Sequence, residues 1–184
     1  AEQPPAIGLA LAGGALCNDA SLQPDPQTGR YGVIGDPTEG ALLVAACQAG
    51  LVRSEILVAA PRVAELPFDS ERKRMTTVHR LPDDPADLPE ALAGLRAAGL
   101  RPGERYIAFT KGAVDGMLDI SRRIWVGGEP QPLDDAWRKR IHQANEQMAQ
   151  KGMRVLGIGV QWIDEPDDEL ERDLPLEAIF RTQT

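Results

Sequence analysis

Short apolar runs alternate along the chain with longer stretches that carry one apolar face, the first typical of strands and the second of helices. Helices are expected over residues 36–50, 54–60 and 134–150, and another is expected to begin at residues 111–113. Strands are expected over residues 31–34, 63–68, 75–81, 105–110 and 153–160, and over residues 123–130 as the entry to a hairpin turn. Residues 6–16 are small and apolar and fit either a buried helix or a buried strand.

This order of elements predicts an α+β fold with a single mixed, mainly antiparallel β-sheet flanked by helices. With 184 residues, the chain has the length of one domain, residues 1–184. Residues 21–33 are expected to be loop-like, with the short strand at residues 31–34 at the end of this stretch. Residues 82–104 are rich in Pro, Asp and Gly and are expected to form a surface excursion, with a candidate helix over residues 89–98.

The helix at residues 36–50 has a well-marked start. Asp36 occupies the N-cap position, Pro37 the first helical position and Glu39 the third. At the third position, Glu39 can reach back to the backbone N–H of Asp36 as part of a capping box, or its carboxylate can serve a ligand. Both interpretations remain open from the sequence, and Asp36 is expected to act as a helix cap.

A charged connection joins two of the predicted strands. Phe68 ends the first strand, the triplet Arg72-Lys73-Arg74 follows, and Met75 opens the second strand. An exposed ring beside cations suits a flat, anionic ligand, whereas a strand-end Phe can equally belong to the core. Because side chains alternate along a strand, the three cations cannot all face one ligand. We favour Lys73 for that contact and expect Arg74 to face solvent.

Composition limits the classes of function. The net charge of −8 disfavours binding of nucleic acid, so an anion site must be a local cationic pocket on an acidic body. Cys17 and Cys47 form no CxxC pattern, and His79 and His142 lack the spacing of metal ligands. No Walker loop, dinucleotide fingerprint or nucleophile motif is present. We therefore expect no metal site and no self-sufficient catalytic centre.

Four segments in order carry a family resemblance: residues 35–42 (GDPTEGAL), 68–75 (FDSERKRM), 109–113 (FTKGA) and 152–156 (GMRVL). Together with Cys17-Asn18-Asp19, they resemble the nucleotide-binding (N) domain of P-type ATPases in the calcium/sodium-pump branch. The resemblance covers residues 15–163. Because the opening residues do not resemble a natural start and no membrane span is present, we expect a domain cut from a larger membrane pump.

The resemblance implies a role in handling ATP, which the full pump uses as Mg-ATP. The domain would hold adenosine and deliver the γ-phosphate to an aspartate in a separate domain, without turnover on its own. Its partners would be the phosphorylation and actuator domains of the same polypeptide at the cytoplasmic face of the membrane. The isolated domain is expected to be a monomer.

The resemblance also assigns roles to single residues. Phe68 would stack on adenine, Glu39 would accept from its amino group, and Lys111 would line the same pocket. Lys73 would help to hold the nucleotide, Arg154 would contact the phosphates, and Met75, Gly112 and Ala113 would form the walls. Arg154 is expected within a buried strand, where its charge would need a partner. Asn18 is expected to make a structural turn.

The chain departs from the family pattern at residues 177–184, which do not run into the family's Asp-Pro-Pro stretch, and at two places in the site segments. Ser70 stands where several relatives have an arginine, and Val114-Asp115 replaces the more usual Pro-Glu. Ser70 and Val114 are the features that would support an alternative function, a non-catalytic interaction module that keeps the fold and no longer binds ATP. The sequence does not name the transported ion, although the resemblance is to the calcium-type pumps.

Overall fold

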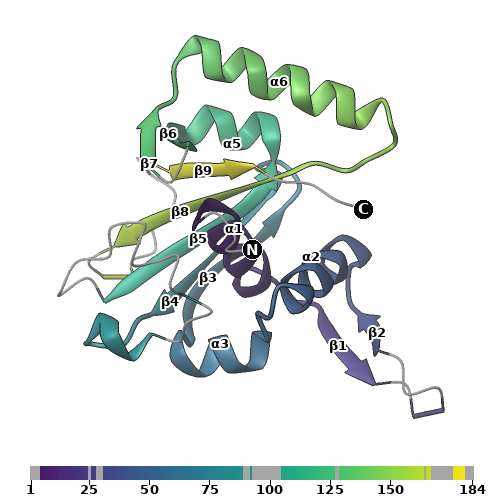
Figure 1. The fold of residues 1–184 in the computed structure, drawn as a ribbon, viewed down its shortest axis with the longest axis vertical. Coiled ribbons are helices and arrows are strands. Elements are labelled where there is room, and N and C mark those ends of the chain that lie inside the picture. Colours follow the sequence, from purple (N-terminus) through teal and green to yellow (C-terminus); the bar gives the residue numbers. More distant parts are fainter. Residues whose placement is uncertain are drawn as a thin grey trace.

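The computed structural model of the protein describes residues 5–24, 26–27, 31–88, 92, 105–126, 129–163, 165–166 and 176–180. Its centre is a seven-stranded sheet in the order β3-β4-β5-β8-β9-β6-β7 (Figure 1). Six strands of this sheet lie before residue 164: β3 (Arg62–Asp69), β4 (Arg74–Arg80), β5 (Tyr106–Ala113), β6 (Ser121–Val126), β7 (Glu129–Pro132) and β8 (Leu156–Ile163). The seventh, β9 (Leu176–Phe180), lies between β8 and β6.

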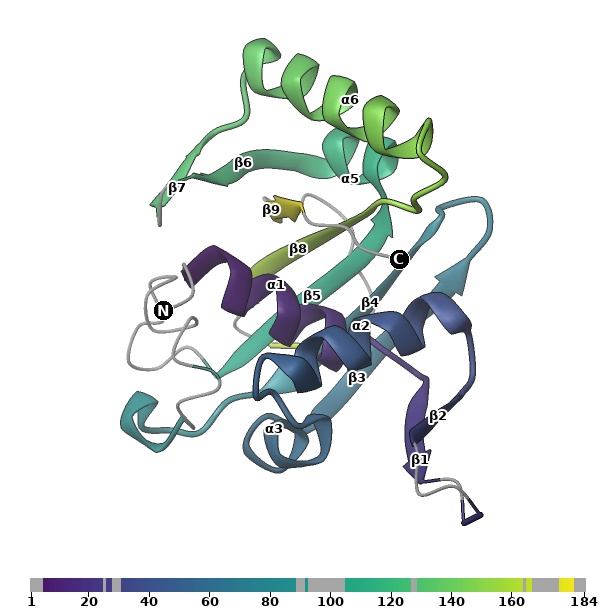
Figure 2. The ribbon, with the colours of Figure 1, turned by 45° about the vertical axis from the view of Figure 1, so that its right-hand side comes forward.

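All neighbouring strands of this sheet are antiparallel except β6 and β9, which are parallel. A second, two-stranded sheet consists of β1 (Ser21–Pro24) and β2 (Tyr31–Ile34), and it extends away from the large sheet (Figures 1 and 2). The predicted fold class, α+β with a mixed and mainly antiparallel sheet flanked by helices, is confirmed. The small hairpin is an addition to the single sheet that we expected.

Two groups of helices cover the large sheet. The first group consists of α1 (Pro5–Leu16), α2 (Pro37–Gln48) and α3 (Arg53–Ala59), and the second of α5 (Val114–Ile120) and α6 (Asp135–Ala149). Figure 2 shows α1 crossing the strands β5 and β8. Ile124 packs with α5 and α6, whereas its neighbour Trp125 packs with the α1 cluster. Because consecutive strand residues face opposite sides, the two groups lie on opposite faces of β6.

The ends of the predicted helices are set by caps. The Asp36 carboxylate accepts the N–H groups of Thr38 and Glu39 at the start of α2, which confirms its capping role. Gly152 follows α6 with φ of 77°, and the Met153 N–H donates to the carbonyl of Met148 at 3.1 Å. This 6→1 bond is the Schellman arrangement, in which the left-handed residue is usually glycine.

Several strands begin or end at other residues than predicted, because the elements next to them extend or shorten them. Lys111, Gly112 and Ala113 belong to β5, because β4 and β8 pair with this segment on both sides. The helix α5 therefore begins at Val114. Strand β8 begins at Leu156, since the cap of α6 occupies the preceding residues. The strand β1 was expected to be a loop, and β9 was not predicted.

The segment at residues 82–104 is described only at residues 82–88 and 92, so the candidate helix at residues 89–98 lies largely outside the described residues. A short 3₁₀ helix covers Pro85–Asp87. Leu88 and Leu92 are buried in the main core, where the sequence had suggested a surface excursion. Within the described residues, no single helix is long and apolar enough to cross a membrane, although α2 and α3 together, bent by 83°, reach the necessary length and composition.

Candidate functional site

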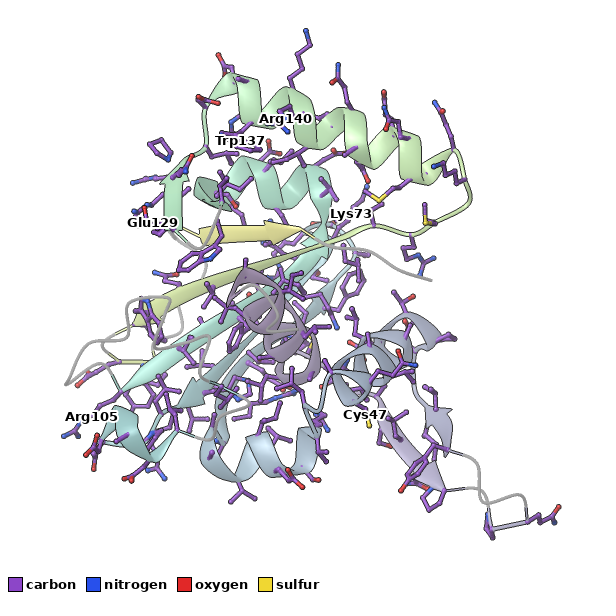
Figure 3. The ribbon with its side chains drawn as sticks, viewed as in Figure 1. Cys47, Lys73, Arg105, Glu129, Trp137 and Arg140 are labelled. Carbon is purple, nitrogen blue, oxygen red and sulfur yellow. The ribbon has the colours of Figure 1, made fainter. Side chains whose placement is uncertain are left out.

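A pocket of about 600 Å³ opens at one end of the strands β4 and β5, and we call it the sheet-end pocket. Figure 3 places Lys73 at this end of the sheet and Arg105 at the opposite end of β5. The pocket is lined by Asp19, Asp36, Thr38, Glu39, Phe68, Lys73, Met75, Lys111, Gly112, Ala113, Arg154, Val155 and Leu156. All eight residues that the sequence assigned to a nucleotide site are therefore brought together.

Strand register places the floor of the pocket. Met75 lies directly across from Lys111 in the β4–β5 pair, and Ala113 follows two residues later on the same face. Gly112 between them allows the β3–β4 turn to approach closely. A Cβ added at Gly112 would lie 2.8 Å from the carbonyl oxygen of Lys73 and 2.7 Å from the Cβ of Arg74. A residue without a side chain is therefore needed at this position.

The deepest polar group of the pocket is an ion pair. Lys111 Nζ lies 2.5 Å from Glu39 Oε1, and only 8% and 17% of these side chains are exposed. The second oxygen, Glu39 Oε2, accepts the backbone N–H groups of Asp19 at 3.0 Å and Ala20 at 3.1 Å. The capping-box interpretation of Glu39 is thus wrong, because both carboxylate oxygens bind groups other than the Asp36 N–H.

Phe68 stands at the rim of the pocket. Its side chain is 63% exposed, which excludes the core role that the sequence had left open. Met75, by contrast, is fully buried and joins the pocket to the main core. The pocket thus combines an accessible aromatic ring at its mouth with an apolar wall and a polar pair inside.

Lys73 lies in the β3–β4 turn with φ of 53°, in the left-handed region. Among the described residues, no other residue except glycine has a positive φ. Lys73 lines the pocket, as the sequence predicted, whereas Arg74 does not. Arg74, the first residue of β4, is half-buried rather than exposed to solvent.

Arg154 differs from its prediction. It precedes β8 and is exposed, so its charge does not need a buried partner. Its guanidinium donates to Thr38 Oγ1 at 2.7 Å, near the start of α2. The N–H groups of Glu39 and Thr38, together with the nearby Arg154, hold the pKa of Asp36 below its usual value. Arg154 and Asp36 therefore attract each other as opposite charges in the lining of the pocket.

The charges of the lining are balanced rather than cationic. Three cations, Lys73, Lys111 and Arg154, accompany three carboxylates, Asp19, Asp36 and Glu39. Asp19 is paired with Arg62 at 2.8 Å, and Glu39 is paired with Lys111. The expected cationic pocket is thus wrong for the lining as a whole. Lys73 and Arg154 remain after these pairs, and Asp36 partly offsets their positive charge.

Five lining residues were not predicted as site residues: Asp19, Asp36, Thr38, Val155 and Leu156. All five lie within the segments that carry the family resemblance, so position in those segments was the available signal. Asp36 had been given only its capping role. The sequence could not indicate that the start of α2 and the segment before β8 meet across the pocket.

The remaining candidates have structural roles. Asn18 is buried and accepts the N–H of Ala20 through Oδ1, the structural turn that was expected. His79 is buried between the carbonyl of Ala60 and the hydroxyl of Thr77. Cys17 is buried, and burial raises the pKa of its thiol. Within the described part of the chain, no group of three His, Cys, Asp or Glu side chains is placed to hold a metal ion.

Comparison with known proteins agrees with this arrangement. The chain matches the family model "P-type ATPase, cytoplasmic domain N" over residues 8–184. It is 34% identical over 172 residues to the "Probable cation-transporting ATPase F" of Mycobacterium tuberculosis (strain ATCC 25618 / H37Rv), which covers 92% of this chain and 16% of that protein. It is 32% identical over 169 residues to the "Calcium-transporting ATPase 1" of Bacillus cereus (strain ATCC 10987 / NRS 248), covering 90% of this chain and 16% of that protein.

A third relative, the "Cation-transporting ATPase pma1" of Synechocystis sp. (strain ATCC 27184 / PCC 6803 / Kazusa), is 29% identical over 162 residues, covering 88% of this chain and 15% of that protein. The chain thus spans about a sixth of the length of these relatives. The family model covers nearly the whole chain. The chain belongs to the family of P-type ATPase cytoplasmic N domains.

Proposed function

We propose that this chain is the ATP-binding domain of a P-type cation-transporting ATPase. It holds the adenosine part of ATP in the sheet-end pocket and leaves the γ-phosphate free for an aspartate in a separate domain. The observation that carries this proposal is the convergence of five distant segments on one pocket, with an exposed aromatic ring at its mouth.

The size and chemistry of the pocket suit a nucleoside. A volume of about 600 Å³ lies within the usual range for small-molecule sites. Phe68 offers an accessible ring face on which a base stacks, and Met75 and Ala113 offer apolar walls. Stacking on Phe68 would fix the plane of adenine in the pocket.

The buried ion pair supplies the polar contacts for the base. Glu39 Oε2 already accepts two backbone N–H groups, whereas Oε1 accepts only Lys111 among the described residues. A carboxylate oxygen has two lone pairs, so Oε1 retains an acceptor for the amino group of adenine. The Lys111 ammonium has three N–H donors and uses one of them on Glu39, which leaves donors for the base or ribose.

The phosphates would lie toward the rim, near Lys73 and Arg154. Both side chains are exposed, and Asp36 stands nearby, so their attraction for the triphosphate is screened. One stacking contact of about 1–3 kcal/mol and two or three charge-assisted hydrogen bonds of about 1.5–3 kcal/mol each give about 4–12 kcal/mol in total. The middle of this range exceeds an association cost of at least about 4 kcal/mol by about 4 kcal/mol or less. We therefore expect a dissociation constant in the upper micromolar to millimolar range.

In the full pump, ATP would be used as Mg-ATP, with the metal held by the phosphates and the separate domain. The names of relatives include both cation-transporting and calcium-transporting ATPases, and we infer a cation pump of the calcium type. The domain would work at the cytoplasmic face of the membrane with the phosphorylation and actuator domains of its own polypeptide. We expect the isolated domain to be a monomer that binds ATP without turnover.

Titration of the ¹⁵N-labelled chain with ATP tests the proposal. We expect amide shift changes confined to the surroundings of Phe68, Lys111 and Glu39, saturating by a few millimolar. No change at 10 mM ATP (about ten times the weak end of the expected range) would favour the alternative, an interaction module that has lost nucleotide binding. Steady ATP hydrolysis by the pure chain would contradict the delivery role.

A further inference from the structure

Two arginines outside the sheet-end pocket bind the backbone segment that donates hydrogen bonds to Glu39. Arg53 lies at the start of α3 and Arg62 at the start of β3, and neither lines the pocket. Arg53 Nη2 donates to the backbone carbonyl of Asn18 at 2.6 Å, and Arg62 Nη2 donates to the same carbonyl at 2.8 Å. A carbonyl oxygen has two lone pairs, so the two guanidinium groups together saturate this acceptor.

The other end of the same peptide unit faces the pocket. The N–H of Asp19, which shares the peptide with the Asn18 carbonyl, donates to Glu39 Oε2 at 3.0 Å. Two positive charges at the carbonyl polarise the peptide and strengthen the donor at its N–H. One peptide unit thus connects two guanidinium groups to the carboxylate that pairs with Lys111.

Further contacts hold this peptide in one orientation. Arg62 Nη1 donates to Asp19 Oδ1 at 2.8 Å, and Asn18 Nδ2 donates to the backbone carbonyl of Glu39 at 2.9 Å. Asn18 is completely buried. The position of the Glu39 carboxylate is therefore fixed by α3 and β3 as well as by α2, on which Glu39 itself lies.

We propose that Arg53 and Arg62 are positioning residues for the nucleotide site, acting through the Asn18–Asp19 peptide on Glu39. This inference rests on the proposed function where it concerns ATP, whereas its structural part concerns the Asp19–Glu39 hydrogen bond alone. It predicts that nucleotide affinity depends on two side chains that the nucleotide does not touch. Because both arginines bind one carbonyl, each partly substitutes for the other.

A purely structural role is the competing explanation. Arg53 Nε donates to the carbonyl of Ala15 and Arg62 Nη2 to that of Leu16, both at the end of α1, so the arginines also cap this helix. Arg138 provides a matched control. It donates to the carbonyls of Leu118 and Ser121 at the end of α5, does not line the pocket, and makes neither of these hydrogen bonds to Glu39 or to the Asn18–Asp19 peptide.

The test compares Arg53→Gln, Arg62→Gln, the double variant and Arg138→Gln by ATP titration and thermal unfolding. We expect each single variant to weaken ATP binding about threefold, and the double variant about thirtyfold, more than the roughly ninefold product of independent sites. Arg138→Gln should lower the melting temperature and leave ATP affinity unchanged. Equal affinity in the double variant and the wild type would overturn the inference and leave only helix capping.

Amide hydrogen exchange provides a readout that needs no nucleotide. Exchange at the Asp19 N–H should be faster in the double variant and unchanged in Arg138→Gln.

If the wild type fails to bind ATP, the proposed function fails, and exchange at Asp19 still decides whether the two arginines support the Asp19–Glu39 hydrogen bond. If the double variant does not fold, Arg62→Lys replaces it. Lysine keeps the charge but lacks the planar fork that reaches Asp19 and the carbonyls together, so faster exchange is again expected. Unchanged exchange at Asp19 would refute the inference.

Discussion

Replacement of Phe68 by alanine separates ligand binding from folding more cleanly than any other change in the pocket. Phe68 is 63% exposed, so only about a third of the residue is covered by protein. A fully buried Phe contributes about 1.5–3 kcal/mol, and the covered part therefore contributes about 0.5–1 kcal/mol to the free energy of unfolding. Stacking of a base on an aromatic ring is worth about 1–3 kcal/mol. The expected loss of ATP affinity is thus about 5- to 150-fold.

Changes at Lys111 or Glu39 would be harder to interpret, because each would leave the other charge nearly buried without its partner. Removal of one member of a buried pair commonly costs about 3–5 kcal/mol of stability. Such variants would lose folded protein as well as binding. Phe68→Ala, by contrast, leaves no buried charge without its partner.

Isothermal titration calorimetry or amide shifts can measure ATP binding to Phe68→Ala and to the wild type under the same salt conditions. Tyr31→Ala is the matched control, since Tyr31 is also an exposed aromatic residue, 72% exposed, but lies in β2 away from the pocket lining. We expect unchanged affinity in Tyr31→Ala and melting temperatures close to the wild type in both. Wild-type affinity in Phe68→Ala would refute the stacking role.

Three further changes test the supports of the site. Asp36→Ala removes the cap that accepts two N–H groups of α2 and should cost about 0.5–2 kcal/mol in chemical denaturation, whereas Asp36→Asn should retain most of the stability. Gly112→Ala places a Cβ 2.7 Å from that of Arg74, so it should lower the free energy of unfolding by about 1–3 kcal/mol and weaken ATP binding. Gly8→Ala is its control: Gly8 lies in α1, and a Cβ there would meet no atom within 4 Å, so this variant should be neutral or stabilising in thermal unfolding. Burial lowers the pKa of His79 from 6.5 to about 4, so between these values the unfolded chain takes up a proton that the folded chain does not, and stability falls with falling pH. His79→Gln should remove up to about 3 kcal/mol of this loss between pH 6.5 and 4, and an unchanged pH profile of unfolding would contradict the assignment.

The sequence predicted which residues line the pocket more accurately than it predicted the secondary structure in which they lie. Phe68, Lys73 and Lys111 were each placed in the site from motifs, and all three line it. Their roles toward ATP stay predictions. Lys111 was expected where a helix begins, yet it lies inside β5, because pairing with β4 and β8 extends the strand beyond the point that its own composition indicates.

Local signals determined the elements whose cause is local. The caps at Asp36 and Gly152 bind backbone groups within a few residues, so the neighbouring residues alone are sufficient to set the start of α2 and the end of α6. The strand β9, of five residues, is different. It occupies the gap between β8 and β6, and only the edges of those two strands provide its hydrogen bonds.

Only the tertiary structure decided what Glu39 and Arg154 do. The sequence left Glu39 between a capping box and a ligand, and placed Arg154 in a buried strand. The fold brings Asp19, Ala20 and Lys111 to the Glu39 carboxylate and leaves Arg154 exposed beside Thr38. These contacts join residues 19 to 116 positions apart, and no local pattern specifies which distant groups will meet. The sequence by itself thus determined the family pattern and the capped helices, whereas packing determined the partners of each charge.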